Sequence, residues 1–279
     1  MNGCSNDGRG DEGRFAALDG APFPDFAPGS VWLVGAGPGA PGLLTLLGYH
    51  ALCHADVVVH DALVGEAVLG FARPGTRRIY AGKRGGKPSA VQADITETLI
   101  GEARTGARVL RLKGGDPFMF GRGGEECEAL YRAGIAYRVV PGISAGLGGL
   151  AYAGLPATHR DINQSVTFLT GHDLTGALPH AIDWPMVAKA SPVVVMYMAA
   201  KHLPAIAQRL IAGGRAPDEP VAVIAHATLP DQAVIRLSLG EATTPRDLPT
   251  PAVVVLGRAV TKSESLEWFD AAASRGLFG

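Results

Sequence analysis

The chain has 279 residues, of which 47% are apolar, and its formal net charge is −1. This length allows one large domain or two smaller ones with substantial cores, and the lack of a basic excess argues against a nucleic-acid partner. Three cysteines without CxxC spacing, Cys4, Cys53 and Cys127, argue against a disulfide or zinc scaffold. No apolar run is long enough to span a membrane, and the acidic N-terminus does not resemble a secretory signal. We therefore expect a cytoplasmic protein without a membrane partner.

The first half of the chain alternates apolar runs with segments of helical periodicity. Residues 1–29 are rich in Gly, Asp, Asn and Pro, which predicts a disordered leader. Continuous apolar strands that alternate with helices are typical of a parallel sheet covered on both faces, so we predict an α/β domain of this kind over 30–142. Its strands are expected at 31–34, 56–60, 108–112 and 137–140, and its helices at 43–53, 90–104 and 125–133.

The second half has a different pattern, in which strand-like runs outnumber helices. This composition favours a mixed sheet that includes an antiparallel hairpin. We predict a second α/β domain over 143–261, followed by a polar tail over 262–279. The strands of this domain are expected at 165–170, 192–198, 220–225, 232–239 and 251–257, and its helices at 144–153 and 203–212.

One loop region concentrates the chemistry of the first half. The segment RLKGGDPFMFGRGGEE (111–126) leaves an apolar run and contains five glycines before it opens a helix-like segment. Glycines allow a backbone to approach a ligand closely, and an open α/β sheet binds its ligand where strands end. Phe118, Met119 and Phe120 are costly to expose to water, so a ligand site is favoured over a simple surface loop.

Two motifs suggest other functions. GAGPGA (35–40) matches a dinucleotide fingerprint and would indicate a nicotinamide oxidoreductase. Pro38 and Pro41 argue against it, because they remove N–H donors that a pyrophosphate needs. GISAG (142–146) matches the nucleophile elbow of a serine hydrolase, with Ser144 as nucleophile. Pro141 argues against this assignment, because it would disturb the strained end of the strand.

Two further groups of residues are candidates for ligand binding. GKRGGK (82–87) is not a Walker A loop, since Ala81 and Pro88 stand where that motif needs glycine and Ser/Thr; we interpret it as an anion-binding or acid–base loop. His50, Cys53 and His54 share a helical face, but no fourth ligand with suitable spacing follows. We therefore expect no metal site.

Taken together, the motifs resemble those of the tetrapyrrole methylases. The matching pieces occur in family order and cover most of 31–260. They are VGAGPGAPGLLTL (34–46), ADVVVHDALV (55–64), GKRGG (82–86), RLKGGDPFMFGRGGEE (111–126), VVPGISAG (139–146), AYAGLPATHR (151–160), TGH (170–172) and VVMYMA (194–199). The LKGGDPF and THR pieces favour the branch of the family that methylates uroporphyrinogen III.

The resemblance implies a two-domain fold, a homodimer, and S-adenosylmethionine as cofactor in the cleft between the domains. The implied reaction methylates carbons 2 and 7 of uroporphyrinogen III and gives precorrin-2, which feeds sirohaem and cobalamin synthesis. Another precorrin methyltransferase of the corrin pathway, or a cofactor-binding protein without catalysis, remains an alternative.

The resemblance also assigns roles to individual residues. The implied proton acceptor is Asp61 and the implied proton donor is Lys83. Ala227 stands where the family has glycine, so its methyl group is expected beside the cofactor. The implied cofactor contacts are Pro38, Gly114, Gly115, Asp116, Met119, Ser144, Ala145, Met198 and Ala227.

An acidic tetrapyrrole on a nearly neutral protein requires locally concentrated positive charge. Arginine binds carboxylates in a forked geometry, which makes Arg122 and Arg160 the leading candidates for substrate binding, with His159 and Lys83 beside them. Glu125 is expected to orient Arg122. Both Glu125 and Glu126 also suit the start of a helix, where negative charge complements the dipole.

Overall fold

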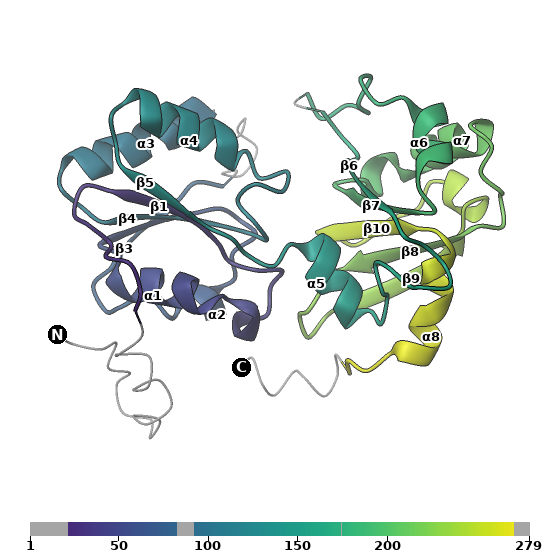
Figure 1. Ribbon diagram of the computed structural model, residues 1–279, viewed down its shortest axis with the longest axis horizontal. Helices are drawn as coiled ribbons and strands as arrows, with labels where there is room; N and C mark the ends of the chain where they lie inside the picture. The colour runs from purple at the N-terminus through teal and green to yellow at the C-terminus, as the bar shows by residue number, and fades with distance from the viewer. Residues whose placement is uncertain (1–21, 83–91, 174, 271–279) are drawn as a thin grey trace. The chain divides into compact units, whose positions relative to one another are not determined.

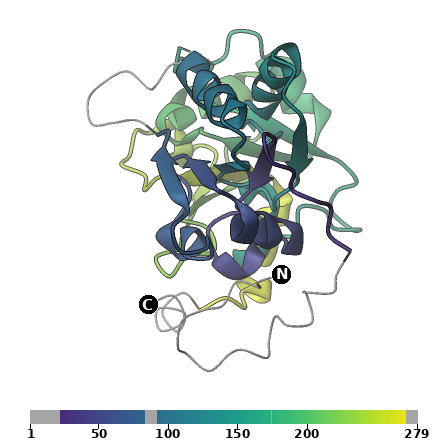
Figure 2. The same cartoon turned by 90° about the vertical axis from the view of Figure 1, so that its left-hand side faces the viewer.

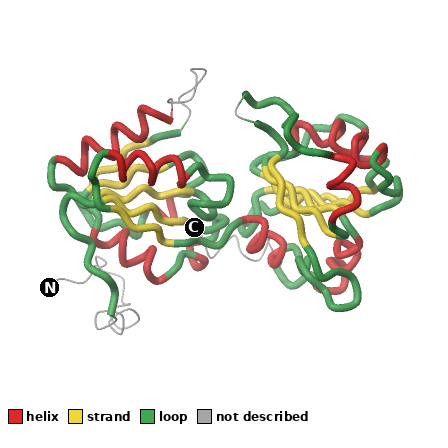
Figure 3. The backbone as a smooth tube through the Cα atoms, turned by 45° about the horizontal axis from the view of Figure 1, so that its top comes forward, coloured by secondary structure: helices red, strands yellow, loops and turns green. Residues whose placement is uncertain are grey.

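A computed structural model describes residues 22–82, 92–173 and 175–270 of the chain. The chain divides into two compact units, one up to Ile143 and the other from Ser144 onward. Each unit is built around one five-stranded sheet with helices on both of its faces (Figures 1 and 3). This architecture confirms the predicted α/β class. Among the described residues, no helix combines the length and apolar character needed to cross a bilayer.

The sheet of the first unit is entirely parallel, with the strand order β3-β2-β4-β1-β5. Its strands are β1 (Val31–Gly35), β2 (Val57–His60), β3 (Arg77–Tyr80), β4 (Val109–Lys113) and β5 (Tyr137–Val140). The sequence pattern does not reveal β3, because this edge strand reads RRIY and three of its four side chains are exposed. Edge strands are often charged in this way, which hides the apolar signal.

Helices cover both faces of this sheet. On one face lie α1 (Leu46–His54) and α2 (Glu66–Leu69), and on the other lie α3 (Gln92–Arg104) and α4 (Gly123–Arg132) (Figures 1 and 2). The side chains of β4 alternate between two apolar clusters: Leu110 and Leu112 pack with α1 and α2, whereas Val109 packs with α3 and α4. Because side chains in a strand alternate, Arg111 and Lys113 also face α4.

The sheet of the second unit is mixed, as predicted, with the strand order β6-β7-β10-β8-β9. Only β6 and β7 pair in parallel, and β8 and β9 form the expected hairpin. The strands are β6 (Val166–Thr170), β7 (Val193–Tyr197), β8 (Pro220–Ala225), β9 (Ala233–Ser238) and β10 (Ala252–Leu256).

The helices of the second unit divide between its two apolar clusters. One cluster holds α6 (Trp184–Ala190) and α7 (Leu203–Ala212), and the other holds α5 (Ala145–Tyr152). Helix α6 is not among the helices predicted from the sequence. The residues that could have indicated it are Asp183 and the proline that follows at 185: in the structure Asp183 is the N-cap, and its side chain accepts a hydrogen bond from Met186 N at 2.9 Å.

Part of the predicted disordered leader and part of the predicted polar tail contact the folded units. Phe26 is 3% exposed and stacks on Trp32, so the residues just before β1 pack on the first unit, contrary to a disordered leader through residue 29. In the expected polar tail, α8 (Ser263–Leu266) is followed by Trp268, which contacts Tyr152 edge to face. Burial of the Phe26 ring offsets the entropy lost on ordering this segment. Residues 1–21 and 271–279 lie outside the described ranges.

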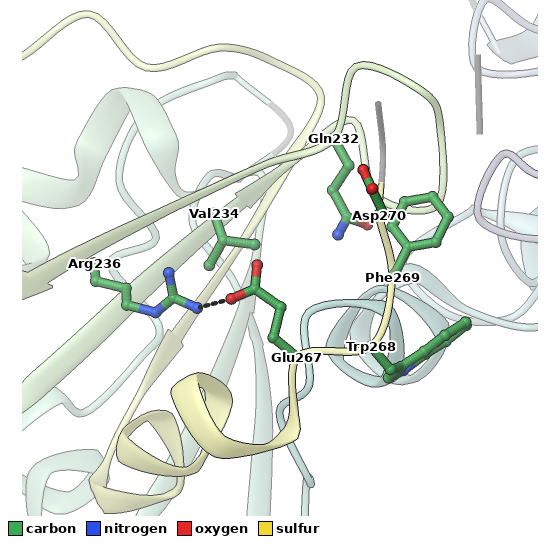
Figure 4. A pocket seen from close by; sticks show the side chains of 7 residues that line it. All are labelled: Gln232, Val234, Arg236, Glu267, Trp268, Phe269 and Asp270. Atoms are coloured by element: carbon green, nitrogen blue, oxygen red, sulfur yellow. Dashed lines mark ion pairs between the residues drawn. The ribbon is translucent and has the colours of Figure 1, made fainter. Parts of the chain in front are cut away.

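The packed C-terminal segment forms one wall of a pocket against β9 (Figure 4). The pocket has a volume of about 440 Å³, and Arg236 and Glu267 form an ion pair of 3.7 Å on its wall. It is lined by Gln232, Val234, Arg236, Glu267, Trp268, Phe269 and Asp270, none of which was predicted as a site residue.

Candidate active site

Three loops are joined at the carboxyl edge of the first sheet. Gly115 N donates to Gly37 O at 2.7 Å, which ties the loop after β4 to the loop after β1. Asp116 Oδ2 accepts from Gly142 N at 3.0 Å, which adds the loop after β5. Pro38 and the segment 114–116 therefore lie together, as the resemblance implies, at the edge where parallel sheets bind ligands.

The carboxylate of Asp116 holds this loop in shape. Its Oδ1 accepts from Phe118 N at 2.8 Å, and its Oδ2 accepts from Gly142 N at 3.0 Å. Both oxygens thus bind backbone N–H groups of the protein itself. Asp116 therefore holds the glycine loop in shape.

Asp61 follows β2 at the same edge. Its Oδ1 accepts from Leu63 N at 3.0 Å, and its Oδ2 lies 3.8 Å from Arg111 Nη2. The Asp61 side chain remains 26% exposed. The turn also packs on the glycine loop, because a Cβ added to Gly114 would meet Leu63 Cβ at 2.6 Å. Asp61 is thus fixed in orientation, accessible, and beside a cation.

Beneath Asp61 lies a cluster of buried charges that the sequence analysis did not predict. Glu126 is fully buried, and its carboxylate binds Arg111 Nε at 3.1 Å and Lys113 Nζ at 3.1 Å. Burial lowers the pKa of Lys113, and the nearby Arg111 lowers it further, while Glu126 opposes both effects. Buried charges are costly unless they are paired. The sequence pattern that could have indicated this cluster is the pair Arg111 and Lys113, two residues apart in an otherwise apolar strand.

Arg122 and Glu125 lie at the beginning of α4 and contact each other, as predicted. Arg122 Nε donates to Glu125 Oε1 at 3.0 Å, and both side chains are exposed. Arg122 has a left-handed backbone with φ of 59°, and Phe120 nearby has φ of 52°. This conformation is unusual for large side chains and is concentrated at ligand sites. The guanidinium is therefore presented to solvent by a constrained loop that also contains Met119.

In the second unit, the remaining predicted cofactor residues surround α5. Ser144 and Ala145 begin this helix, Met198 follows β7, and Ala227 follows β8. Met198 has φ of 54° and is 40% exposed. The other non-glycine residues with positive φ among those described in this unit, His226 and Thr228, flank Ala227. The described non-glycine residues with positive φ in this unit are thus the predicted cofactor residue Met198 and the two neighbours of the predicted cofactor residue Ala227.

The methyl group of Ala227 does not face the expected direction. Ala227 is 7% exposed and belongs to the apolar cluster around α5. A Cβ added to Gly149 would lie 2.8 Å from Ala227 Cβ, so this methyl group packs against the bare backbone of α5. The methyl group of Ala227 is therefore accommodated in the core.

This packing predicts the effect of Gly149→Ala. The added methyl group is expected to lower the free energy of unfolding by about 1–3 kcal/mol through overpacking, and the double variant with Ala227→Gly should recover most of the loss. Denaturant unfolding measures both changes. Gly101→Ala serves as the control, because nothing lies within 4 Å of the added carbon. Equal stability of G149A and G101A would contradict the predicted contact.

The other predicted residues lie in the turn between α5 and β6 or outside the described ranges. Arg160 is exposed, and His159 Nδ1 accepts a hydrogen bond from Asp161 N at 3.3 Å. The buried side chain of Asn163 holds this turn by accepting from His159 N at 3.1 Å. Lys83, the expected proton donor, falls in the segment 83–91, which the structure does not describe.

The geometry argues against the two rival enzymes. Gly37 N donates to Gly115 O and Ala36 N donates to Lys113 O, so these groups do not serve a pyrophosphate. Ser144 has ordinary extended dihedrals, φ −70° and ψ 145°, and its Oγ lies 2.6 Å from the Tyr197 hydroxyl rather than from a histidine. Neither a nucleotide cradle nor a nucleophile elbow is formed.

The histidine–cysteine face of α1 is occupied by other contacts. The ring centroids of His50 and His54 lie 4.2 Å apart with the rings tilted, and His54 Nδ1 lies 2.7 Å from His50 O. Cys53 is buried, with Sγ 3.8 Å from Phe71 O. Within the described ranges, no group of three or more His, Cys, Asp or Glu side chains is arranged to hold a metal ion.

Known proteins share this fold and these motifs. The family model of the Tetrapyrrole (Corrin/Porphyrin) Methylases matches residues 30–243. A Sinorhizobium protein named uroporphyrinogen-III C-methyltransferase is 56% identical over 260 residues, which cover 92% of this chain and 93% of that protein. Siroheme synthase 3 of Aeromonas hydrophila is 46% identical over 94% of this chain, but the match covers only 56% of the relative. The chain thus spans about half the length of that siroheme synthase.

Solved structures agree with the family model. The crystal structure of uroporphyrin-III C-methyl transferase from Thermus thermophilus complexed with S-adenyl homocysteine has a TM-score of 0.72 and 38% identity, over 83% of this chain and 99% of that one. A cobalt precorrin-4 methyltransferase has a TM-score of 0.73 and 26% identity, over 85% of this chain and 98% of that one. The chain belongs to the tetrapyrrole methylase family.

Proposed function

We propose that this protein transfers methyl groups from S-adenosylmethionine to carbons 2 and 7 of uroporphyrinogen III, giving precorrin-2. The observation that carries the proposal is the 56% identity to a uroporphyrinogen-III C-methyltransferase across 93% of its length. The position of Asp61 beside Arg111, and of Arg122 and Glu125 on the same sheet edge, suits this chemistry.

The residues around both clusters fit the proposed cofactor. In the first unit, Asp116 holds the loop with Gly114, Gly115 and Met119 in shape, and two backbone hydrogen bonds between Gly115 and Gly37 tie it to the loop with Pro38. In the second unit, the methyl group of Ala227 is turned into the core. The cofactor residues we propose there are Ser144, Ala145, Met198 and Ala227. The cofactor supplies an electrophilic methyl group, which this chain has to align with a pyrrole carbon.

Methylation of a pyrrole carbon requires the loss of a proton. We propose Asp61 as its acceptor, because Leu63 N holds its carboxylate in orientation and its side chain remains 26% exposed. Lys83 remains the proposed donor on the strength of the resemblance. His159 and Arg160 are proposed to bind carboxylates of the substrate together with Arg122.

The direct test is incubation with uroporphyrinogen III and S-adenosylmethionine labelled in its methyl group. Two labelled methyl groups per product are expected. No transfer would contradict the proposal, and transfer to a later precorrin alone would favour the second candidate, another precorrin methyltransferase. The TM-score of 0.73 with the cobalt precorrin-4 enzyme is the observation that favours this candidate.

The exposed fork of Arg122 predicts a selective effect on substrate binding. Arg122→Leu is expected to raise the KM for the tetrapyrrole at least tenfold or to abolish turnover, because a bidentate charged contact is worth about 1.5–3 kcal/mol. Affinity for S-adenosylhomocysteine should remain nearly unchanged. Steady-state kinetics and calorimetry measure the two effects.

The matched control for R122L is Arg132→Leu. Arg132 lies at the other end of α4 and forms an exposed pair with Glu128 at 2.9 Å. R132L should leave both constants unchanged, since exposed pairs contribute little. An equal loss of cofactor affinity in R122L would rule out a role specific to the substrate.

We also propose a cytoplasmic homodimer that serves sirohaem or cobalamin synthesis. The sirohaem branch is supported by the similarity to siroheme synthases. The buried thiols Cys53 and Cys127 are consistent with a reducing compartment, and burial raises the pKa of Cys127 to about 11. Light scattering of the purified protein tests the dimer.

A further inference from the structure

A tyrosine hydroxyl from the second sheet reaches the start of α5. Tyr197 ends β7, and its hydroxyl accepts a hydrogen bond from Gly146 N at 2.9 Å and lies 2.6 Å from Ser144 Oγ. Ser144 is the N-cap residue of α5, but its own side chain makes no capping bond. The hydroxyl of Tyr197 therefore takes over a role that an N-cap side chain usually performs.

The sequence accommodates this contact with a glycine. A Cβ added to Gly146 would fall on the Tyr197 hydroxyl, so no other residue fits there without displacing the ring. Glycine inside a helix costs about 0.5–1 kcal/mol relative to alanine. The glycine at 146 therefore leaves the space that the Tyr197 hydroxyl occupies.

The backbone of Tyr197 connects two further segments. Its carbonyl oxygen accepts from Gly171 N at 2.7 Å, in the turn after β6. The next residue, Met198, has the left-handed conformation described above. Tyr197 therefore contacts the beginning of α5 through its hydroxyl and sets the turns after β6 and β7 through its backbone.

We propose that Tyr197 is a positioning residue for the cofactor, and this inference rests on the proposed function. Its hydroxyl fixes the rotamer of Ser144 Oγ, whichever of the two oxygens donates, and holds the first turn of α5 in register with Met198. Ser144, Ala145 and Met198 then meet the cofactor with a preorganised geometry, which reduces the entropy lost on binding.

The test is Tyr197→Phe, which keeps the ring and removes the hydroxyl. Affinity for S-adenosylhomocysteine, measured by calorimetry without tetrapyrrole, is expected to fall about tenfold, the equivalent of roughly 1.4 kcal/mol. The KM for the tetrapyrrole should change less than twofold. The matched control is Tyr152→Phe, at the other end of α5, which should bind S-adenosylhomocysteine like the parent protein.

A double-mutant cycle separates positioning from general stabilisation. If Tyr197 acts through Ser144, Ser144→Ala should cost clearly less affinity in the Y197F background than in the parent protein. Additive losses, or an equal loss for both ligands, would overturn the inference. Should Y197F fail to fold, Gly146→Ala decides, because its methyl group displaces the hydroxyl: a tenfold loss supports positioning, and parental affinity overturns it.

The parent protein distinguishes this inference from the proposed function. If it binds no S-adenosylhomocysteine, the proposed function fails and takes the inference with it. If it binds S-adenosylhomocysteine and Y197F binds equally well, only the positioning role of Tyr197 fails.

Discussion

Replacement of Glu126 by glutamine is expected to lower the free energy of unfolding by about 3–5 kcal/mol, the cost of leaving buried charges without their partner. Glu126 is fully buried and its carboxylate contacts both Arg111 and Lys113. A glutamine of nearly the same shape removes the negative charge that compensates them. Denaturant unfolding followed by circular dichroism measures the loss.

Two variants define what this result means. Glu128 lies on the same helix and forms an exposed pair with Arg132. Glu128→Gln should therefore change the free energy of unfolding by less than about 1 kcal/mol. The triple variant R111M/K113M/E126L removes every charge of the cluster, so it should be more stable than E126Q. If E126Q and E128Q unfolded at the same denaturant concentration, the buried cluster would not have the proposed energetic weight.

Replacement of Asp116 by asparagine is expected to weaken binding of S-adenosylhomocysteine about tenfold or more. The two carboxylate oxygens accept from Phe118 N and Gly142 N, whereas an asparagine side chain has only one accepting oxygen. One backbone N–H would then face an NH₂ group, at a cost of about 1–3 kcal/mol. The loop with Gly114 and Gly115 would lose its tie to the end of β5. Calorimetry measures the affinity.

The control for D116N is Asp218→Asn, an exposed carboxylate in the other unit, which should leave affinity unchanged. Unfolding measurements on D116N provide an independent reading, because the lost backbone contact should lower stability whether or not a ligand binds. Parental stability would contradict the role of Asp116 as a tie between loops. Lower stability with parental affinity would instead place the cofactor elsewhere.

The parts of the fold that depend on local pattern could be predicted from the sequence. The apolar runs of β1, β2 and β4 and the strands of the second unit have strong periodicity, so their elements and the α/β class followed directly. Weaker signals failed at β3 and α6, where charged residues or a proline interrupt the pattern. Phe26 and Trp268 lie in segments predicted as polar ends, and their contacts with Trp32 and Tyr152 are visible only in the structure.

Some features of the candidate site could likewise be predicted from motifs, and others could not. Motifs placed Asp61, Arg122 and the glycine loop at strand ends, since the carboxyl ends of parallel strands share one edge. No motif indicated that the carboxylate of Asp116 binds backbone N–H groups, or that the methyl group of Ala227 enters the core. The contacts of Tyr197 with Ser144 and of Glu126 with Lys113 join residues that sequence spacing does not relate.

By itself, the sequence determined the class of fold, every strand except β3 and the family to which its motifs belong, because these depend on local periodicity and on short contiguous segments. Only the tertiary structure decided which charges are buried together, which backbone groups are already bonded and which way each side chain turns. These properties depend on contacts between residues far apart in the chain, whose free energies are set by burial and geometry rather than by residue type.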